Sequence, residues 1–271
     1  MRASTPSFVV SVKVHLPEQI ENHLEKSLNI ANSAYNEALG LGLRRIKAMR
    51  ANPRYQELLE ARQSLAKSTQ RLKKSKGLAW QLRLCDKALY NLRLNYGLSE
   101  FILSKHLTNR RNEPNSPYQH LSSSELQVIA KDAYQTLEKV IFYKVKPHKV
   151  KFRSKYNLNA SFRNKLNSTG TRIVPSEKAG IIYTLYLHKT STFVDISAKA
   201  FSEYQQLSLM RAEKIKYVQI VRKTIRGKRM YYLQIVCQGY PSAKTTKGKN
   251  TVGIDPGVST VAYASSDEVS L

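Results

Sequence analysis

Acidic residues are scarce in this sequence. Its 271 residues include 19 Asp and Glu against 45 Lys and Arg, so the formal net charge at pH 7 is +26. A domain with this excess of one charge repels itself, and a polyanionic partner would relieve the repulsion. Because 41% of the residues are hydrophobic, we still expect a globular chain of one large or two modest domains.

Cysteine, long apolar runs and metal-binding spacings are scarce as well. Only Cys85 and Cys237 are present, which excludes a disulfide framework or a zinc ribbon within these residues and fits a reducing cytoplasm. Neither a long uncharged apolar run nor a signal sequence occurs, so we expect no membrane partner. The six histidines lack HExxH and HxH spacing, and we interpret them as structural or solvated. Nucleic acid is therefore the expected polyanion.

Two kinds of periodicity predict a mixed α/β chain. Apolar residues alternate over residues 8–16, which predicts a strand, and the same period returns after residue 171. Runs at 216–222 and 230–237, joined around Arg226, Gly227 and Lys228, predict a β-hairpin.

Between these strands, a period of three to four residues predicts helices. One begins at Glu18 and weakens at Gly40 and Gly42, a second follows Pro53, and a third covers about residues 80–102 before a polar loop at 109–117. A further helix is predicted after residue 122, because Ser122 and Glu125 have the spacing of a capping box.

A basic segment at residues 144–165 contains no Asp or Glu and has aromatic residues between its cations. A solvated charged face usually mixes both signs, so we favour contact with an RNA backbone, with stacking on the aromatic rings, over a merely solvated loop. The candidate RNA-binding residues of this segment are Lys149, Lys151, Arg153, Lys155, Arg163 and Lys165.

Two further basic clusters are open to two interpretations each. The hairpin cluster either contacts RNA or is a charged loop tip; it consists of Arg222, Lys223, Arg226, Lys228 and Arg229. The cluster at the end of the second helix is either a solvated helix face or a contact to the phosphates of a DNA duplex; it consists of Arg71, Lys73, Lys74 and Lys76.

The last segment, TVGIDPGVSTVAYASSDEVSL, places Asp255 between two apolar runs at 251–254 and 258–264. Gly257 permits a tight reversal there, so the predicted hairpin projects the Asp255 carboxylate where a divalent cation can bind. An ordinary strand-end turn is the plain alternative. Phosphodiester hydrolysis in RNase H-like folds uses two Mg²⁺ or Mn²⁺ ions about 4 Å apart, which one Asp alone cannot hold. Asp267 and Glu268 lie beyond the second run and are not assigned as ligands.

The string GIDPG resembles RuvC resolvases and IscB nucleases, and DxGxS/T turns occur in sugar kinases and heat-shock chaperones, but these families place it near the N-terminus. TnpB proteins of insertion sequences, and the similar type V CRISPR effectors, place it this late. The chain also resembles TnpB in IANSAYNEALGLGL, with its aromatic–Asn pair Tyr35 and Asn36, in LSSSELQVIAKDAYQTLEKV, and in the basic segment VKFRSKYNLNASFR.

This resemblance implies a fold and a division of the chain. The expected fold is an oligonucleotide-binding-like β-barrel, or wedge domain, with a helical recognition insert, followed by the start of an RNase H-like (RuvC) domain. The implied parts are a first barrel strand at 1–17, the helical insert at 18–143, the basic segment and remaining barrel strands at 144–240, a linker at 241–250, and the first hairpin of a truncated nuclease domain at 251–271.

The resemblance also implies RNA-guided cleavage of double-stranded DNA beside a short flanking motif, in the prokaryotic cytoplasm near the nucleoid. A guide RNA would supply specificity by base pairing, Asp255 would be a catalytic metal ligand for Mg²⁺ or Mn²⁺, and a homodimer is one assembly that this allows. Pro256 departs from the aliphatic residue common in the family and stiffens the turn. The second-motif Glu, the third-motif Asp and the zinc ribbon are absent from these 271 residues.

We therefore expect the guide-RNA- and DNA-binding part of such a nuclease, with an incomplete cutting site. One alternative is a catalytically inactive nucleic-acid-binding regulator derived from the same scaffold. Another is an ATPase that uses the DPGVST turn for phosphate, which would also need a nucleotide-closing domain.

Overall fold

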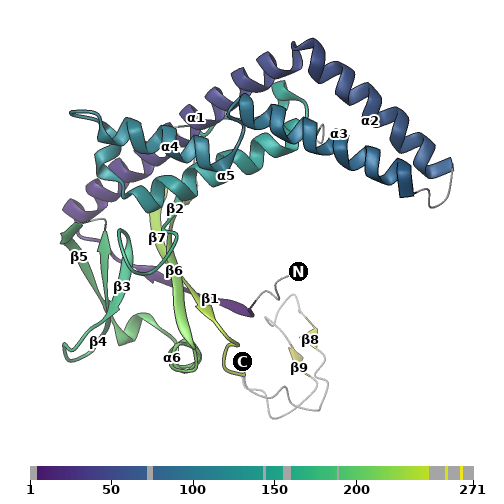
Figure 1. Cartoon of the computed structure of the whole chain (residues 1–271). Coiled ribbons are helices and arrows are strands. Elements are labelled where there is room, and N and C mark those ends of the chain that lie inside the picture. Colours follow the sequence, from purple (N-terminus) through teal and green to yellow (C-terminus); the bar gives the residue numbers. More distant parts are fainter. Residues whose placement is uncertain are drawn as a thin grey trace.

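The computed structural model describes residues 5–71, 76–142, 145–154, 160–187, 189–243, 254–255 and 263–264. The fold is mixed α/β, as predicted: a region of five helices lies in sequence between the first and second strands, and two open antiparallel sheets complete it (Figure 1). The five helices are α1 (Glu18–Arg50), α2 (Pro53–Arg71), α3 (Lys76–Asn95), α4 (Glu100–Asn112) and α5 (Ser123–Ile141).

Helix α1 is longer than the sequence predicted, because it continues through both Gly40 and Gly42. Gly42 is needed for packing: a Cβ atom there would lie 2.1 Å from Cδ1 of Leu137 on α5. The glycine lets α1 and α5 approach closely, and α4 packs against the same pair. Helices α2 and α3 pack on each other and extend away from these three helices (Figure 1).

The predicted third helix was wrong in its extent, because two helices occupy this stretch. Gly97 has a φ of +68°, which breaks the helical path, and the Ser99 side chain accepts a hydrogen bond from the Ile102 N–H at the start of α4. Helix α4 then continues to Asn112, so the predicted polar loop at 109–117 begins later. The capping box of Ser122 and Glu125 is confirmed at the start of α5.

The larger sheet has the strand order β1-β7-β6-β2, and all its neighbours are antiparallel. The predicted β-hairpin is confirmed: β6 and β7 are joined by Arg226 and Gly227, with φ values of 50° and 76°, as a two-residue turn of type I′ requires. The strands are β1 (Ser7–Val14), β2 (Ala160–Arg163), β6 (Lys214–Ile225) and β7 (Lys228–Gln238).

The smaller sheet has the order β3-β4-β5, from strands Arg172–Pro175, Ile181–Leu187 and Lys189–Ser197. The prediction of a β-barrel is not confirmed, because in the part of the chain that the structure describes both sheets are open and no closed barrel is present. Short 3-10 turns lie at Pro117–His120 (η1), Pro147–Lys149 (η2) and Ala198–Ala200 (η3), and β8 (Ile254–Asp255) pairs with β9 (Tyr263–Ala264). None of the described helices combines the length and apolar character that a membrane span requires.

Helix α6 (Glu203–Met210) was not predicted, although its start carries a sequence signal. Ser202 and Gln205 form a capping box in which each side chain bonds the other residue's backbone. The Gln205 side chain also donates to the Ser11 carbonyl, which ties α6 to β1. A capping box can therefore mark even this eight-residue helix.

Candidate nucleic-acid interface

The two faces of the larger sheet differ in character. One face packs into the core with Val12, Leu233, Ile220 and Phe162, which lie opposite one another across the four strands. The next row points the other way and is polar. It consists of Ser11, Gln234, Gln219 and Arg163.

No strand of the larger sheet contains Asp or Glu. Aromatic rings lie among the cations on the polar face, where the Lys223 Nζ atom is 5.1 Å from the centre of the Tyr232 ring. Cations beside exposed aromatic rings are the groups that proteins use to hold nucleic-acid backbones and bases. The cations of the four strands are Lys13, Arg163, Lys214, Lys216, Arg222, Lys223, Lys228 and Arg229.

Two adjoining cavities lie along strands β2 and β6, and we call them together the basic groove. The first, of about 180 Å³, lies between α5 and the sheet edge and is lined by Lys131, Arg163 and Lys165 among others. The second, of about 770 Å³, continues toward the ends of the strands. Lys165 and Tyr217 line both cavities, so the two cavities adjoin at these residues.

Arg163 is held in a fixed position in the groove. Its Nη1 donates to the Tyr217 hydroxyl over 3.2 Å, and its Nη2 donates to Asp132 Oδ1 over 3.2 Å. Burial alone would lower the pKa of Arg163, but the negative charge of Asp132 and the bond to Tyr217 raise it above its ordinary value. The guanidinium is therefore a permanent, oriented positive charge.

The basic segment is anchored to helix α1 by a backbone clamp. The Asn36 side chain donates to the Arg153 carbonyl over 2.8 Å and accepts from the Arg153 N–H over 2.7 Å. The Arg153 guanidinium lies over the Tyr35 ring, 3.8 Å from its centre, and 3.8 Å from Asp132 Oδ2. The three segments that carried the family resemblance thus meet at Tyr35, Asn36, Asp132 and Arg153.

The predicted RNA-binding residues of the basic segment fall into two groups. Lys149, Lys151 and Lys165 are exposed, whereas Arg153 and Arg163 are half-buried and share Asp132 as their acidic partner. The side chains of Lys149 and Lys151 make no hydrogen bond or ion pair with another described residue, and Lys165 makes one bond of 3.4 Å to Gln127. Lys155 lies outside the described residues.

The hairpin cluster divides in the same way. Lys223, Arg226 and Lys228 are exposed. Arg222 is buried, and its Nη1 lies 2.5 Å from Glu25 Oε2 on α1. This cation is therefore paired within the fold, and the prediction that it belongs to a surface cluster was wrong. Arg229 is largely exposed, 3.9 Å from the same carboxylate.

The remaining predicted sites can be placed only in part. Lys76 is exposed at the start of α3, whereas Lys73, Lys74 and the Arg71 side chain lie outside the described residues. The backbone of Asp255 pairs with Tyr263 in the β8–β9 ladder, but its side chain is also outside them. Within the part that the structure describes, no group of three or more His, Cys, Asp or Glu is arranged to hold a metal ion.

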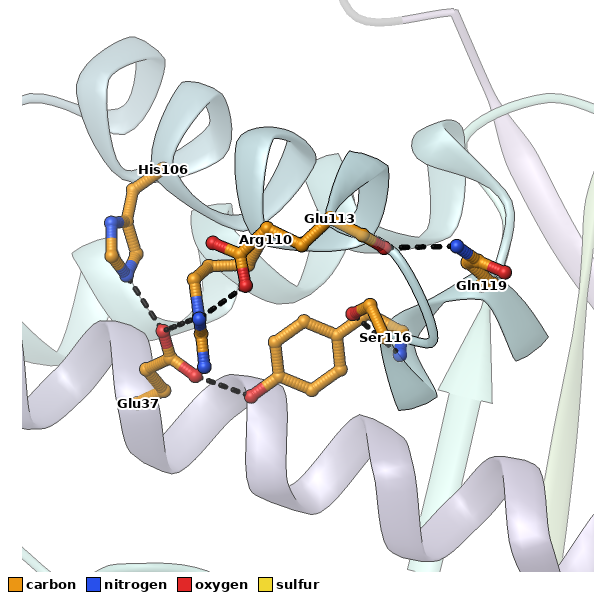
Figure 2. A network of polar contacts seen from close by, with 7 residues as sticks. Glu37, His106, Arg110, Glu113, Ser116 and Gln119 are labelled. Atoms are coloured by element: carbon orange, nitrogen blue, oxygen red, sulfur yellow. Dashed lines mark hydrogen bonds and ion pairs between the residues drawn. The ribbon is translucent and has the colours of Figure 1, made fainter.

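A polar cluster among the helices is centred on Glu37 of α1 (Figure 2). Its carboxylate accepts from His106 Nε2 over 2.7 Å, from Arg110 Nε over 3.2 Å and from the Tyr118 hydroxyl over 2.5 Å. Burial alone would raise the pKa of Glu37, but the bonds from Tyr118 and His106 and the charge of Arg110 lower it below its ordinary value. Glu37 therefore links α1, α4 and η1, and its carboxylate is bonded to groups inside the fold.

No protein-family model and no curated protein matches the sequence. The function of the chain is therefore inferred from its own residues and their geometry.

Several residues of the basic groove were missed by sequence reasoning. Lys131 follows Gln127 by four residues, so both lie on one face of α5, and this face turns toward the groove. Lys214, Lys216 and Tyr217 belong to the acid-free run KIKYVQIVRKTI of β6. The absence of acids from this run was a signal that could have identified them.

Proposed function

We propose that this chain is the guide-RNA- and DNA-binding part of an RNA-guided DNA nuclease of the TnpB and type V effector kind. In this proposal, the two open sheets correspond to the wedge-type barrel of that family, and the helices correspond to its recognition insert. Residues 251–271 correspond to the first hairpin of its RNase H-like domain.

The observation that carries the proposal is the basic groove on a sheet without acids. Cations of β2, β6 and α5 surround it, and exposed lysines of the basic segment and of the hairpin extend the positive surface. Asp132 and Glu25, which pair with Arg163 and Arg222, are engaged inside the fold, so the positive field of the exposed lysines is left for an external polyanion. The groups present fit phosphate contact together with base stacking.

The clamp between Asn36 and Arg153 supports the assignment to this family. Three segments far apart in the sequence were linked only by their resemblance to TnpB, and their side chains contact one another at one place. A common role in presenting the basic segment explains why these segments occur together. Tyr35 and Asn36 are then positioning residues for the cations.

The nuclease part of the proposal concerns Asp255. As the acid of the β8–β9 ladder, followed in sequence by Pro256 and Gly257, it would hold Mg²⁺ or Mn²⁺, which would stabilise charge on the phosphodiester oxygens. Several carboxylates are required for a two-ion site, so we expect binding without efficient cutting from these residues alone. A guide RNA would select the target duplex by base pairing.

The proposal is tested by the salt dependence of binding to labelled single-stranded RNA, measured by fluorescence anisotropy. We expect the triple variant Lys151→Gln, Lys165→Gln and Lys223→Gln to reduce the slope of log K against log salt by about 2, since each phosphate contact contributes about 0.7 for single strands. The affinity should fall at least about tenfold at low salt.

A matched triple removes the same charge elsewhere. Lys87→Gln, Lys105→Gln and Lys199→Gln are exposed positions outside the groove, and we expect nearly the slope of the unmodified chain. Equal losses in the two triples would show that only net charge matters. Absence of RNA binding by the unmodified chain at low salt would also contradict the proposal.

A further inference from the structure

The two cavities of the basic groove differ in the chemistry of their walls. The smaller cavity is lined by three cations, Lys131, Arg163 and Lys165, and by one acid, Glu100. The larger one has apolar wall groups, including Leu166, whose side chain is 59% exposed, and Ile215. Tyr217 stands between them and lines both. One cavity therefore suits an anion, and the other suits a flat, partly apolar group.

The smaller cavity has donors prepared for a phosphate. Arg163 uses one N–H on Tyr217 and one on Asp132, so three of the five donors of a guanidinium remain without a partner among the described residues. The Lys131 ammonium makes no hydrogen bond or ion pair with any described residue. Because Arg163 is already oriented, it loses little freedom when an anion binds.

The larger cavity offers a stacking surface beside this phosphate position. The bond from Arg163 to the Tyr217 hydroxyl fixes the ring on the polar face of the sheet, next to exposed Leu166. Tyrosine rings stack on any nucleic-acid base, because every base has a π-face. A base enters such a cavity only when it has left its helical stack, which a paired base in a duplex has not done.

We propose that the basic groove holds one unpaired nucleotide of a single strand, with its phosphate at Lys131, Arg163 and Lys165 and its base on Tyr217. This inference rests on the proposed function and deepens it by naming the substrate class at this site. The groove then distinguishes single strands from duplexes through shape, and the remaining surface lysines contribute to both kinds of binding.

The test compares Tyr217→Ala on labelled single strands and on a duplex of equal length, by fluorescence anisotropy with the full chain. Loss of a stacked base is expected to weaken single-strand binding about fivefold to a hundredfold, with less than about a twofold change for the duplex. Single strands of RNA and of DNA with one sequence show which polymer the site prefers. Lys131→Gln should reduce the single-strand salt slope by about 0.7.

Two variants control for loss of the fold. Tyr217→Phe keeps the ring and removes only the bond to Arg163, so we expect most of the single-strand affinity to remain. Tyr186→Ala removes a half-buried tyrosine of the smaller sheet, whose ring centre lies 4.8 Å from the Arg172 guanidinium. This variant should leave both affinities unchanged.

The outcomes separate this inference from the proposed function. If the chain binds both polymers and Tyr217→Ala weakens neither, or weakens both equally, the nucleotide site is refuted while nucleic-acid binding stands. If the unmodified chain binds neither polymer, both proposals fall. Selective loss of single-strand binding in Tyr217→Ala, absent from Tyr186→Ala, supports the site.

Discussion

The helical region and the larger sheet differ in whether their strands or helices contain acids to pair with their cations. The helices carry acids and bases together, and Glu37, Asp86 and Asp132 each pair with an arginine within the fold. The strands of the larger sheet carry cations without a single acid of their own. The cations of these strands pair with acids where a helix contacts the sheet, as Arg222 does with Glu25 of α1.

This difference separates structural charge from charge available for binding. A buried cation paired with a largely buried carboxylate, as Arg222 is with Glu25, stabilises the fold and contributes little to an external interaction. An exposed cation on an acid-free face costs the fold self-repulsion, which a polyanion removes when it binds. Net charge alone therefore does not locate the binding surface; the position of the acids does.

The largest effect on stability is expected at the ion pair that joins the two regions, between Glu25 of α1 and Arg222 of β6. Glu25→Gln removes the negative charge of the carboxylate that pairs with buried Arg222 and accepts from the Tyr231 hydroxyl. Breaking one partner of a buried ion pair costs about 3 to 5 kcal/mol of unfolding free energy. Urea denaturation followed by circular dichroism measures this loss.

The control for Glu25→Gln is an ion pair inside the helical region. Arg62 and Asp86 join α2 and α3, and their side chains are 43% and 49% exposed. Asp86→Asn is expected to cost less than about 1 kcal/mol, because water screens such pairs. Similar losses in the two variants would mean that burial does not distinguish the regions.

The next prediction concerns packing within the helical region. Gly42→Ala places a Cβ atom 2.1 Å from Leu137 Cδ1, so α1 and α5 must separate or Leu137 must move. Overpacking of this kind costs about 1 to 3 kcal/mol of unfolding free energy. Thermal and urea denaturation should both show it.

Gly40 provides the matched control one half-turn away on α1. Its added Cβ would be no closer than 3.7 Å to a neighbouring atom, so Gly40→Ala should stabilise the protein by about 0.5 to 1 kcal/mol through helix propensity. If both glycines respond alike, close approach of α5 is not the reason for Gly42.

Local signals predicted the elements well and their continuity poorly. The Ser122–Glu125 capping box and the Arg226–Gly227 turn depend on neighbouring residues alone, and both are confirmed. Gly42 was interpreted as weakening the end of the first helix, because sequence does not show that Leu137, 95 residues later, packs on it. Long-range packing overrides the low helix propensity of glycine there.

The candidate site was predictable to a similar degree. The absence of acids from residues 144–165 was visible in the sequence, and three lysines of this segment, Lys149, Lys151 and Lys165, are exposed in the structure. The pairing of Arg222 with Glu25 was not visible, because it joins residues 197 positions apart. Which cations are paired with an acid depends on the folded structure.

The smallest expected effect concerns acid sensitivity, which should belong to the helical region because the larger sheet has no acid to titrate. Tyr118→Phe removes a hydroxyl that donates to Glu37 and helps to lower the pKa of that carboxyl below 4.5. At neutral pH the variant should lose about 1 kcal/mol of unfolding free energy, at the low end for a bond to a charged group because Glu37 is partly exposed.

The sign of the pH dependence follows from the lowered pKa of Glu37. The stabilisation is complete above the ordinary pKa of 4.5 and is lost as pH falls through the lower pKa of the folded state, so the two proteins should converge in acid. Unfolding free energies measured across this range check it. The control is Tyr96→Phe, which removes a hydroxyl that accepts from neutral Asn52. The unfolding free energy lost in this variant should not change with pH. If both variants show the same pH dependence, Glu37 is excluded as its cause.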